Sequence, residues 1–69
     1  MKELYSIRNQ YGEFFEGMVE GQPSFNPQIK HAVSFGSEIL AYKRMFSILE
    51  ETRYELTGAY EISKFLVFG

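Results

Sequence analysis

One long amphipathic segment, residues 37–56, most constrains how this chain folds. At 100° per residue, its large apolar side chains gather in one half of the helical wheel and its charges in the other. The apolar half contains Ile39, Ala41, Tyr42, Met45, Phe46, Leu49 and Leu56, with Ile48 at its border. Ser37 is suited to cap the helix, and Gly58 is placed to stop it. So wide an apolar half predicts a helix packed against a sheet.

The chain begins with a predicted β-hairpin. Residues 2–9 alternate apolar and polar side chains as a half-buried strand does, and residues 13–17 return as a short second strand. Between them, Asn9 suits the first position of a turn, and Gly12 supplies the positive φ of a bulged hairpin.

The remaining segments complete the predicted fold. Residues 17–27 carry two glycines and two prolines, and we expect them to be the irregular part of the chain. Two alternatives stay open within this segment: residues 18–20 continue the second strand past a bulge, and residues 24–25 form a short third strand. Residues 59–68 predict a last strand after the helix. The order of elements predicts one α+β domain over residues 1–69: an antiparallel sheet of three or four strands with the helix packed across one face.

Composition excludes several functions. The formal net charge of −2 disfavours general nucleic-acid binding, which usually needs a basic surface. The N-terminus does not resemble a signal peptide and no apolar run has a membrane-spanning length, so we expect a cytoplasmic protein without a membrane partner. Without cysteine, no disulfide or thiolate metal site can support a chain of 69 residues.

The residues that catalysis needs are scarce. The chain has no aspartate, no cysteine and one histidine, His31, which we expect in a loop before the helix. No second histidine or spaced carboxylate pair stands near His31 to hold a metal, and the glycines lack the spacing of a phosphate-binding loop. We therefore expect no enzyme activity, no metal and no cofactor.

Aromatic residues are abundant for so small a core. The chain contains seven phenylalanines and five tyrosines, and Phe14 and Phe15 are expected to point to opposite faces of their strand. Residues 65–68 are apolar on both faces, which predicts that the helix covers one face and a second copy the other. This pattern favours a homodimer or an aromatic binding surface; the alternative is that the rings fill the core.

Two sets of residues are candidates for binding a partner. On the polar side of the helix, Leu40, Lys43 and Arg44 are predicted to form a docking surface, the alternative being ordinary solvated helix. The second set is the hairpin with its following loop, including Arg8, Tyr11, Phe15 and Phe25. Rings beside an arginine can stack on a base or anchor a protein. Alternatively, the two phenylalanines form a minor core.

The N-terminal two-thirds of the chain resembles short phage-encoded accessory proteins. The resemblance lies in residues 4–17 (Leu-Tyr-Ser-Ile-Arg-Asn-Gln-Tyr-Gly-Glu-Phe-Phe-Glu-Gly), in Phe25, and in residues 32–37 before the helix; it departs at Gly36, where similar sequences carry a polar residue. It implies a cytoplasmic protein that binds and blocks a host factor, as anti-defence proteins do, and it assigns no functional residue.

Two functions follow as hypotheses. The first is a non-enzymatic interaction protein, a homodimer that binds and inhibits a host protein. The alternative is a protein that sequesters a small, nucleotide-like molecule at a site formed between subunits by residues 17–27.

Overall fold

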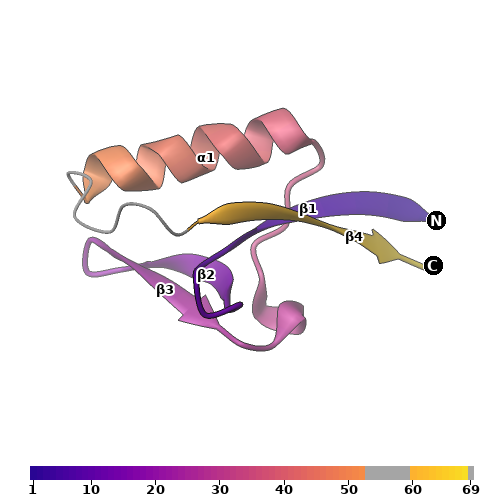
Figure 1. The fold of residues 1–69 in the computed structure, drawn as a ribbon, viewed down its shortest axis with the longest axis horizontal. Coiled ribbons are helices and arrows are strands. Elements are labelled where there is room, and N and C mark those ends of the chain that lie inside the picture. The colour runs from indigo at the N-terminus through magenta and orange to yellow at the C-terminus, as the bar shows by residue number, and fades with distance from the viewer. Residues whose placement is uncertain (53–59, 69) are drawn as a thin grey trace.

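The computed structural model of the protein describes residues 1–52 and 60–68 (Figure 1). Its elements, in order, are β1 (Lys2–Arg8), β2 (Phe14–Val19), β3 (Gln22–Asn26), the 3₁₀ turn η1 (Ile29–His31), α1 (Glu38–Glu51) and β4 (Glu61–Val67). The four strands form one antiparallel sheet in the order β3-β2-β1-β4. The predicted α+β class, with one helix and a four-stranded sheet, is confirmed.

β1 is the strand around which the sheet curls. It pairs with β4 along its whole length, from Lys2 opposite Val67 to Arg8 opposite Glu61, so the N- and C-terminal ends lie together (Figure 1). With β2, in contrast, its register contains one pair, Arg8 opposite Phe14. Beyond this pair β2 turns away, and the segment that precedes α1 takes its place beside β1.

Three backbone hydrogen bonds hold that segment in the gap between the strands. The Tyr5 N–H donates to the Phe35 carbonyl at 2.9 Å, and the Phe35 N–H donates to the Tyr5 carbonyl at 2.8 Å. The Val33 N–H donates to the Phe15 carbonyl of β2 at 2.9 Å. The chain therefore enters the helix already attached to both strands.

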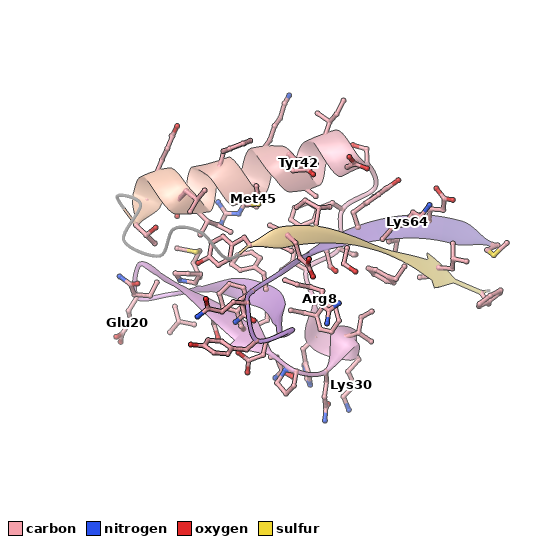
Figure 2. All side chains as sticks on the ribbon, in the orientation of Figure 1. Arg8, Glu20, Lys30, Tyr42, Met45 and Lys64 are labelled. Carbon is pink, nitrogen blue, oxygen red and sulfur yellow. The ribbon has the colours of Figure 1, made fainter. Side chains whose placement is uncertain are left out.

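Most of residues 17–27 are regular: the second strand continues past a bulge and a third strand forms, as the two alternatives allowed, but β3 is longer than the expected residues 24–25. β2 continues through a bulge between Phe15 and Gly17 and joins β3 by a two-residue turn. Figure 2 shows Glu20 at this turn. Glu20 and Gly21 have φ of 51° and 79°, the left-handed values that a tight turn of matching twist requires at both positions. Pro23 is tolerated because β3 is an edge strand.

The helix begins as predicted. The Ser37 hydroxyl accepts a hydrogen bond from the Leu40 N–H at 3.3 Å, which satisfies one of the free amides of the first turn. α1 ends at Glu51, followed by the buried Thr52, whose hydroxyl donates to the Ile48 carbonyl at 2.9 Å. The predicted continuation to Leu56 and the predicted stop at Gly58 lie outside the described residues.

The centre of the core is one buried cluster from three elements. Ile7 of β1, Phe15 of β2 and Ile48 of α1 are fully buried or nearly so, and Val33, Phe35 and Met45 are among the half-buried side chains packed on them. The chain before α1 thus contributes to the core as well as to the sheet. α1 also contacts β4.

The prediction of which helix residues face the core is partly wrong. Ala41 and Ile48 are buried as expected, but Ile39, Tyr42 and Phe46 are 68%, 41% and 54% exposed. At 100° per residue, the apolar arc extends from Ala41 to Ile39 over about 160°. The cluster beneath α1 covers only the end of this arc near Ala41 and Ile48, because Ile7 and Phe15 present a narrow contact surface.

The assigned face can be tested with three substitutions at two positions of α1. Ile48→Ala is expected to lower the free energy of unfolding by about 2–5 kcal/mol, and Ile48→Val by about 0.5–1.5 kcal/mol, because each removes buried methyl groups. Phe46→Ala, the control on the exposed side, is expected to change it by about 0.5 kcal/mol or less. Urea denaturation measures all three, and a Phe46→Ala cost as large as that of Ile48→Ala would contradict the assignment.

The β2–β3 turn offers a stabilising substitution. A side chain with a Cβ at Glu20's φ of 51° costs about 1–2 kcal/mol unless it is Asn or Asp, which tolerate this conformation. Glu20→Asn is therefore expected to raise the free energy of unfolding by about 0.5–1 kcal/mol. Thermal denaturation measures the change, with Gln28→Asn, at φ −96°, as the control. An unchanged or lower Tm for Glu20→Asn would show that the turn is not strained.

Candidate protein-binding surface

The seven residues that sequence analysis selected for binding do not form one site. Arg8 and Tyr11 belong to the β1–β2 hairpin, and Phe15 and Phe25 lie in or against the core of the sheet. The other three are on α1, where they differ in exposure. The selected residues are Arg8, Tyr11, Phe15, Phe25, Leu40, Lys43 and Arg44.

The Arg8 guanidinium is engaged within its own hairpin. Its Nε and a terminal nitrogen lie 3.4 Å and 3.2 Å from the Gly12 carbonyl oxygen, to which they donate. Its Cζ lies 5.0 Å from the centre of the Phe14 ring, and a second terminal nitrogen lies 3.9 Å from a Glu61 carboxylate oxygen. Arg8 therefore connects the turn to β4.

The turn itself is held by Asn9, as its sequence predicted. The Asn9 side-chain oxygen accepts from the Tyr11 and Glu13 N–H groups at 3.0 Å and 2.9 Å, and Gly12 has the expected positive φ of 78°. Tyr11 is 76% exposed at the tip of this turn. Of Arg8, Tyr11, Phe15 and Phe25, it is the only residue that is exposed.

Phe15 is a core residue, so its predicted place on a binding surface is wrong. Its side chain is 1% exposed and lies in the cluster with Ile7 and Ile48. Phe25 is half-buried against it, with ring centres 6.0 Å apart at 65°, an edge-to-face pair. The alternative, that both phenylalanines form part of the core, is what the structure shows. Phe14, on the other face of β2, packs against Arg8.

Tyr60 completes this aromatic cluster. Its ring centre lies 5.5 Å from that of Phe25, and burial raises the pKa of its phenol above 10.0. A raised pKa means that the folded protein disfavours the ionised phenolate.

On the helix, Arg44 is turned toward the sheet, contrary to its predicted place on the solvent side. It is half-buried, with its Cζ 5.7 Å from the centre of the Phe15 ring. A terminal nitrogen lies 3.3 Å from the Ser47 hydroxyl and 3.5 Å from a Glu51 carboxylate oxygen. The aliphatic part of an arginine can cover apolar surface while its charge stays in water, which explains this position. Leu40 and Lys43 are exposed as predicted.

The largest exposed apolar feature of α1 is a row that sequence analysis placed in the core. Ile39, Tyr42 and Phe46 follow one another at spacings of three and four residues and all exceed 40% exposure. Residues at these spacings lie on one side of a helix, so the three side chains form a continuous row, here called the helix stripe. The sequence did contain a sign of this row, because the apolar arc of the helix is too wide for one narrow contact. Only the fold shows which part of the arc stays uncovered.

The helix stripe is suited to contact and not to chemistry. Tyr42 supplies its only polar group, a phenol, and Leu40 and Lys43 lie exposed on the same helix. Across residues 1–52 and 60–68, no three His or Glu side chains are placed to hold a metal ion. No helix in this part of the chain is long and apolar enough to cross a membrane.

Comparison of the chain with protein-family models, with curated proteins and with solved structures found no match. Among the exposed surfaces of the described residues, the helix stripe is the one whose side chains are suited to contact with a partner. Apolar side chains of this size contribute to binding when a partner removes them from water.

The raised pKa of Tyr60 predicts a difference in alkaline stability. A group whose pKa is higher in the folded state stabilises that state below the unfolded value of 10.0, and this contribution is lost as pH rises through the folded value. Wild type is therefore expected to lose more unfolding free energy between neutral pH and pH above 10.0 than Tyr60→Phe, which keeps the ring. Urea denaturation at the two pH values measures this, and equal losses would contradict it.

Proposed function

We propose that this chain is a non-enzymatic interaction protein that binds another protein through the helix stripe. The observation that carries the proposal is the uncovered row of Ile39, Tyr42 and Phe46 along α1. Anchors at i, i+3 and i+7 are the pattern by which an amphipathic helix occupies an apolar groove of a partner. The matching partner therefore presents an apolar groove about two turns of helix in length.

The energetics favour a protein over other ligands. Aromatic rings bury about 150–250 Å² each and are enriched among the residues that dominate interface energies. Tyr42 and Phe46 provide two such rings on a helix whose backbone is already ordered, so little conformational entropy is lost on binding. The net charge of −2 disfavours a general nucleic-acid partner.

Leu40 and Lys43 extend this surface around the helix. At 100° per residue, Lys43 lies beside the stripe on the outermost side of α1, with Leu40 farther around. Both are exposed, so a groove that takes the stripe brings its rim close to Lys43. A carboxylate on that rim would pair with the ammonium group, and this contact would add orientation more than affinity.

The resemblance to phage-encoded accessory proteins makes a host protein the expected class of target and inhibition the expected consequence. A rigid helix that occupies a functional groove inhibits by excluding the groove's own ligand. This part of the proposal derives from the resemblance of the sequence, whereas the binding surface derives from the exposure of the helix stripe.

The experiment compares three immobilised variants in a lysate of candidate host cells. Phe46→Glu places a charge in the helix stripe, and Val19→Glu places the same charge at another exposed apolar position, at the end of β2. A target is expected to be retained by wild type and Val19→Glu and reduced at least roughly tenfold with Phe46→Glu, because burying an unpaired carboxylate opposes binding.

The activity of the retained protein then tests inhibition. Wild type is expected to inhibit it, and Phe46→Glu is expected to leave it active at the same concentration. The proposal would be wrong if wild type and Phe46→Glu retained the same proteins in the same amounts. Circular dichroism of each variant serves as the folding control.

A further inference from the structure

The two edges of the described sheet differ in how they are protected. β3, at one edge, is five residues long and contains Pro23, whose missing N–H interrupts any further pairing. β4, at the other edge, is seven residues long and contains neither proline nor glycine. Natural sheets protect their free edges because an unprotected one pairs with another strand. β4 lacks such protection, so it has the features of an edge strand that pairs with a further strand.

Its backbone groups can be assigned a direction. The Tyr5 N–H and carbonyl both bond to Phe35, so they point away from β4. In an antiparallel strand the backbone groups of successive residues point to opposite sides. The N–H and carbonyl of Ser6 therefore point toward β4, where its partner is Ser63. On β4, the backbone groups of Ser63 point back toward β1. The N–H and carbonyl groups of its neighbours Ile62 and Lys64 therefore point to the free edge, and so do those of Leu66.

The charges of β4 are already paired within the chain. The Lys64 ammonium lies 3.8 Å from a Glu3 carboxylate oxygen, and a Glu61 carboxylate oxygen lies 3.9 Å from the Arg8 guanidinium. At the far end of the strand, Leu66 and Phe68 are 46% and 79% exposed. The free edge thus combines neutralised charges with uncovered apolar side chains, which favours an apolar strand as its occupant.

We infer that the occupant is β4 of a second copy of this chain, paired antiparallel about a two-fold axis at Phe65. In this register Lys64 lies opposite the partner's Leu66, and Ile62 lies opposite the partner's Phe68. The outward backbone groups of these residues meet in reciprocal hydrogen-bonded pairs. Phe65 lies opposite its own copy in a non-hydrogen-bonded pair, where side chains approach more closely.

Charge and the length of the paired segment select this register over its neighbours. An axis at Lys64 would place the two Lys64 side chains directly opposite each other, which is destabilising. An axis at Ser63 would pair only residues 61–65 and leave the apolar end of the strand exposed. An axis at Leu66 would pair only residues 64–68 and leave the outward backbone groups of Ile62 without partners. The axis at Phe65 opposes no like charges and pairs residues 62–68, which extends the sheet from four strands to eight across the dimer.

Two substitutions of equal polarity test the register. Leu66→Lys places a lysine opposite the partner's Lys64, whereas Leu66→Glu places a carboxylate there. Because of the two-fold symmetry, each contact occurs twice in the dimer. Both changes are at an exposed side chain. Within the chain, residue 66 also lies opposite Glu3 of β1, so Leu66→Glu adds a like-charge pair to the β1–β4 ladder and Leu66→Lys an opposite-charge pair. These contacts lie within one copy and are present in monomer and dimer alike, and circular dichroism checks that each variant keeps the fold. Sedimentation velocity over a concentration series gives the dissociation constant of the purified wild type and of each variant.

Wild type is expected to form a dimer, and Leu66→Lys is expected to dissociate at least roughly tenfold more readily than Leu66→Glu. Wild type that stays monomeric at every concentration would overturn the inference and leave the edge to a strand of another protein. Equal dissociation constants for the two variants would also overturn it, because the register places residue 66 opposite Lys64. The measurement uses the purified chain alone, so its outcome is independent of any target bound by the helix stripe.

Discussion

The structure depends on one small contact, in which Ile48 of α1 meets Ile7 of β1 and Phe15 of β2. Ile7 and Phe15 come from the first two strands and Ile48 from a helix far along the chain, and the three side chains are the centre of the core. Because a domain of this size buries a smaller share of its surface than a large one does, the contact also limits what else can be covered. Arg44 extends it by laying its side chain over the Phe15 ring, and Val33 and Phe35 close it from the segment before the helix.

The narrowness of this contact explains why the surface is so apolar. α1 carries an apolar arc wider than the surface it rests on, so Ile39, Tyr42 and Phe46 remain in water. Leaving three large side chains exposed contributes nothing to folding, and such surfaces commonly mark interaction sites. The same reasoning applies to the end of β4, where Leu66 and Phe68 extend beyond the part of the sheet that the core covers. The proposed binding through α1 and the proposed pairing through β4 use different parts of the molecule.

The curl of the sheet separates the candidate residues that the sequence grouped. β2 leaves β1 after Phe14, and Phe15 then enters the core while Tyr11 stays at the tip of the turn. Arg8 is held by the Gly12 carbonyl and the Phe14 ring, so it supports the hairpin from which Tyr11 extends. An aromatic and arginine cluster that is continuous along the sequence is therefore divided between turn and core by the fold.

Local physical chemistry made much of this protein predictable from its sequence. Alternation along residues 2–9 and 59–68, the turn from Asn9 to Gly12 and the Ser37 cap depend on neighbouring residues, and the structure has β1, β4, this turn and this cap. The class, a sheet with one helix, followed from the order of these elements. The strands of the β2–β3 hairpin were left as alternatives because glycine and proline also mark loops, and only pairing reveals Glu20 and Gly21 as the tight turn that joins them.

Tertiary structure alone decided the candidate sites. A helical wheel shows how wide an apolar arc is, but which part of it meets Ile7 and Phe15 depends on contacts between segments far apart in the chain. Likewise, alternation predicts a strand at the C-terminal end without telling whether it is central or at an edge. The order β3-β2-β1-β4 made it an edge. The sequence by itself therefore determined the elements and their polarity, whereas their contacts determined which apolar residues are left for a partner, because burial is a property of segments brought together from different parts of the chain.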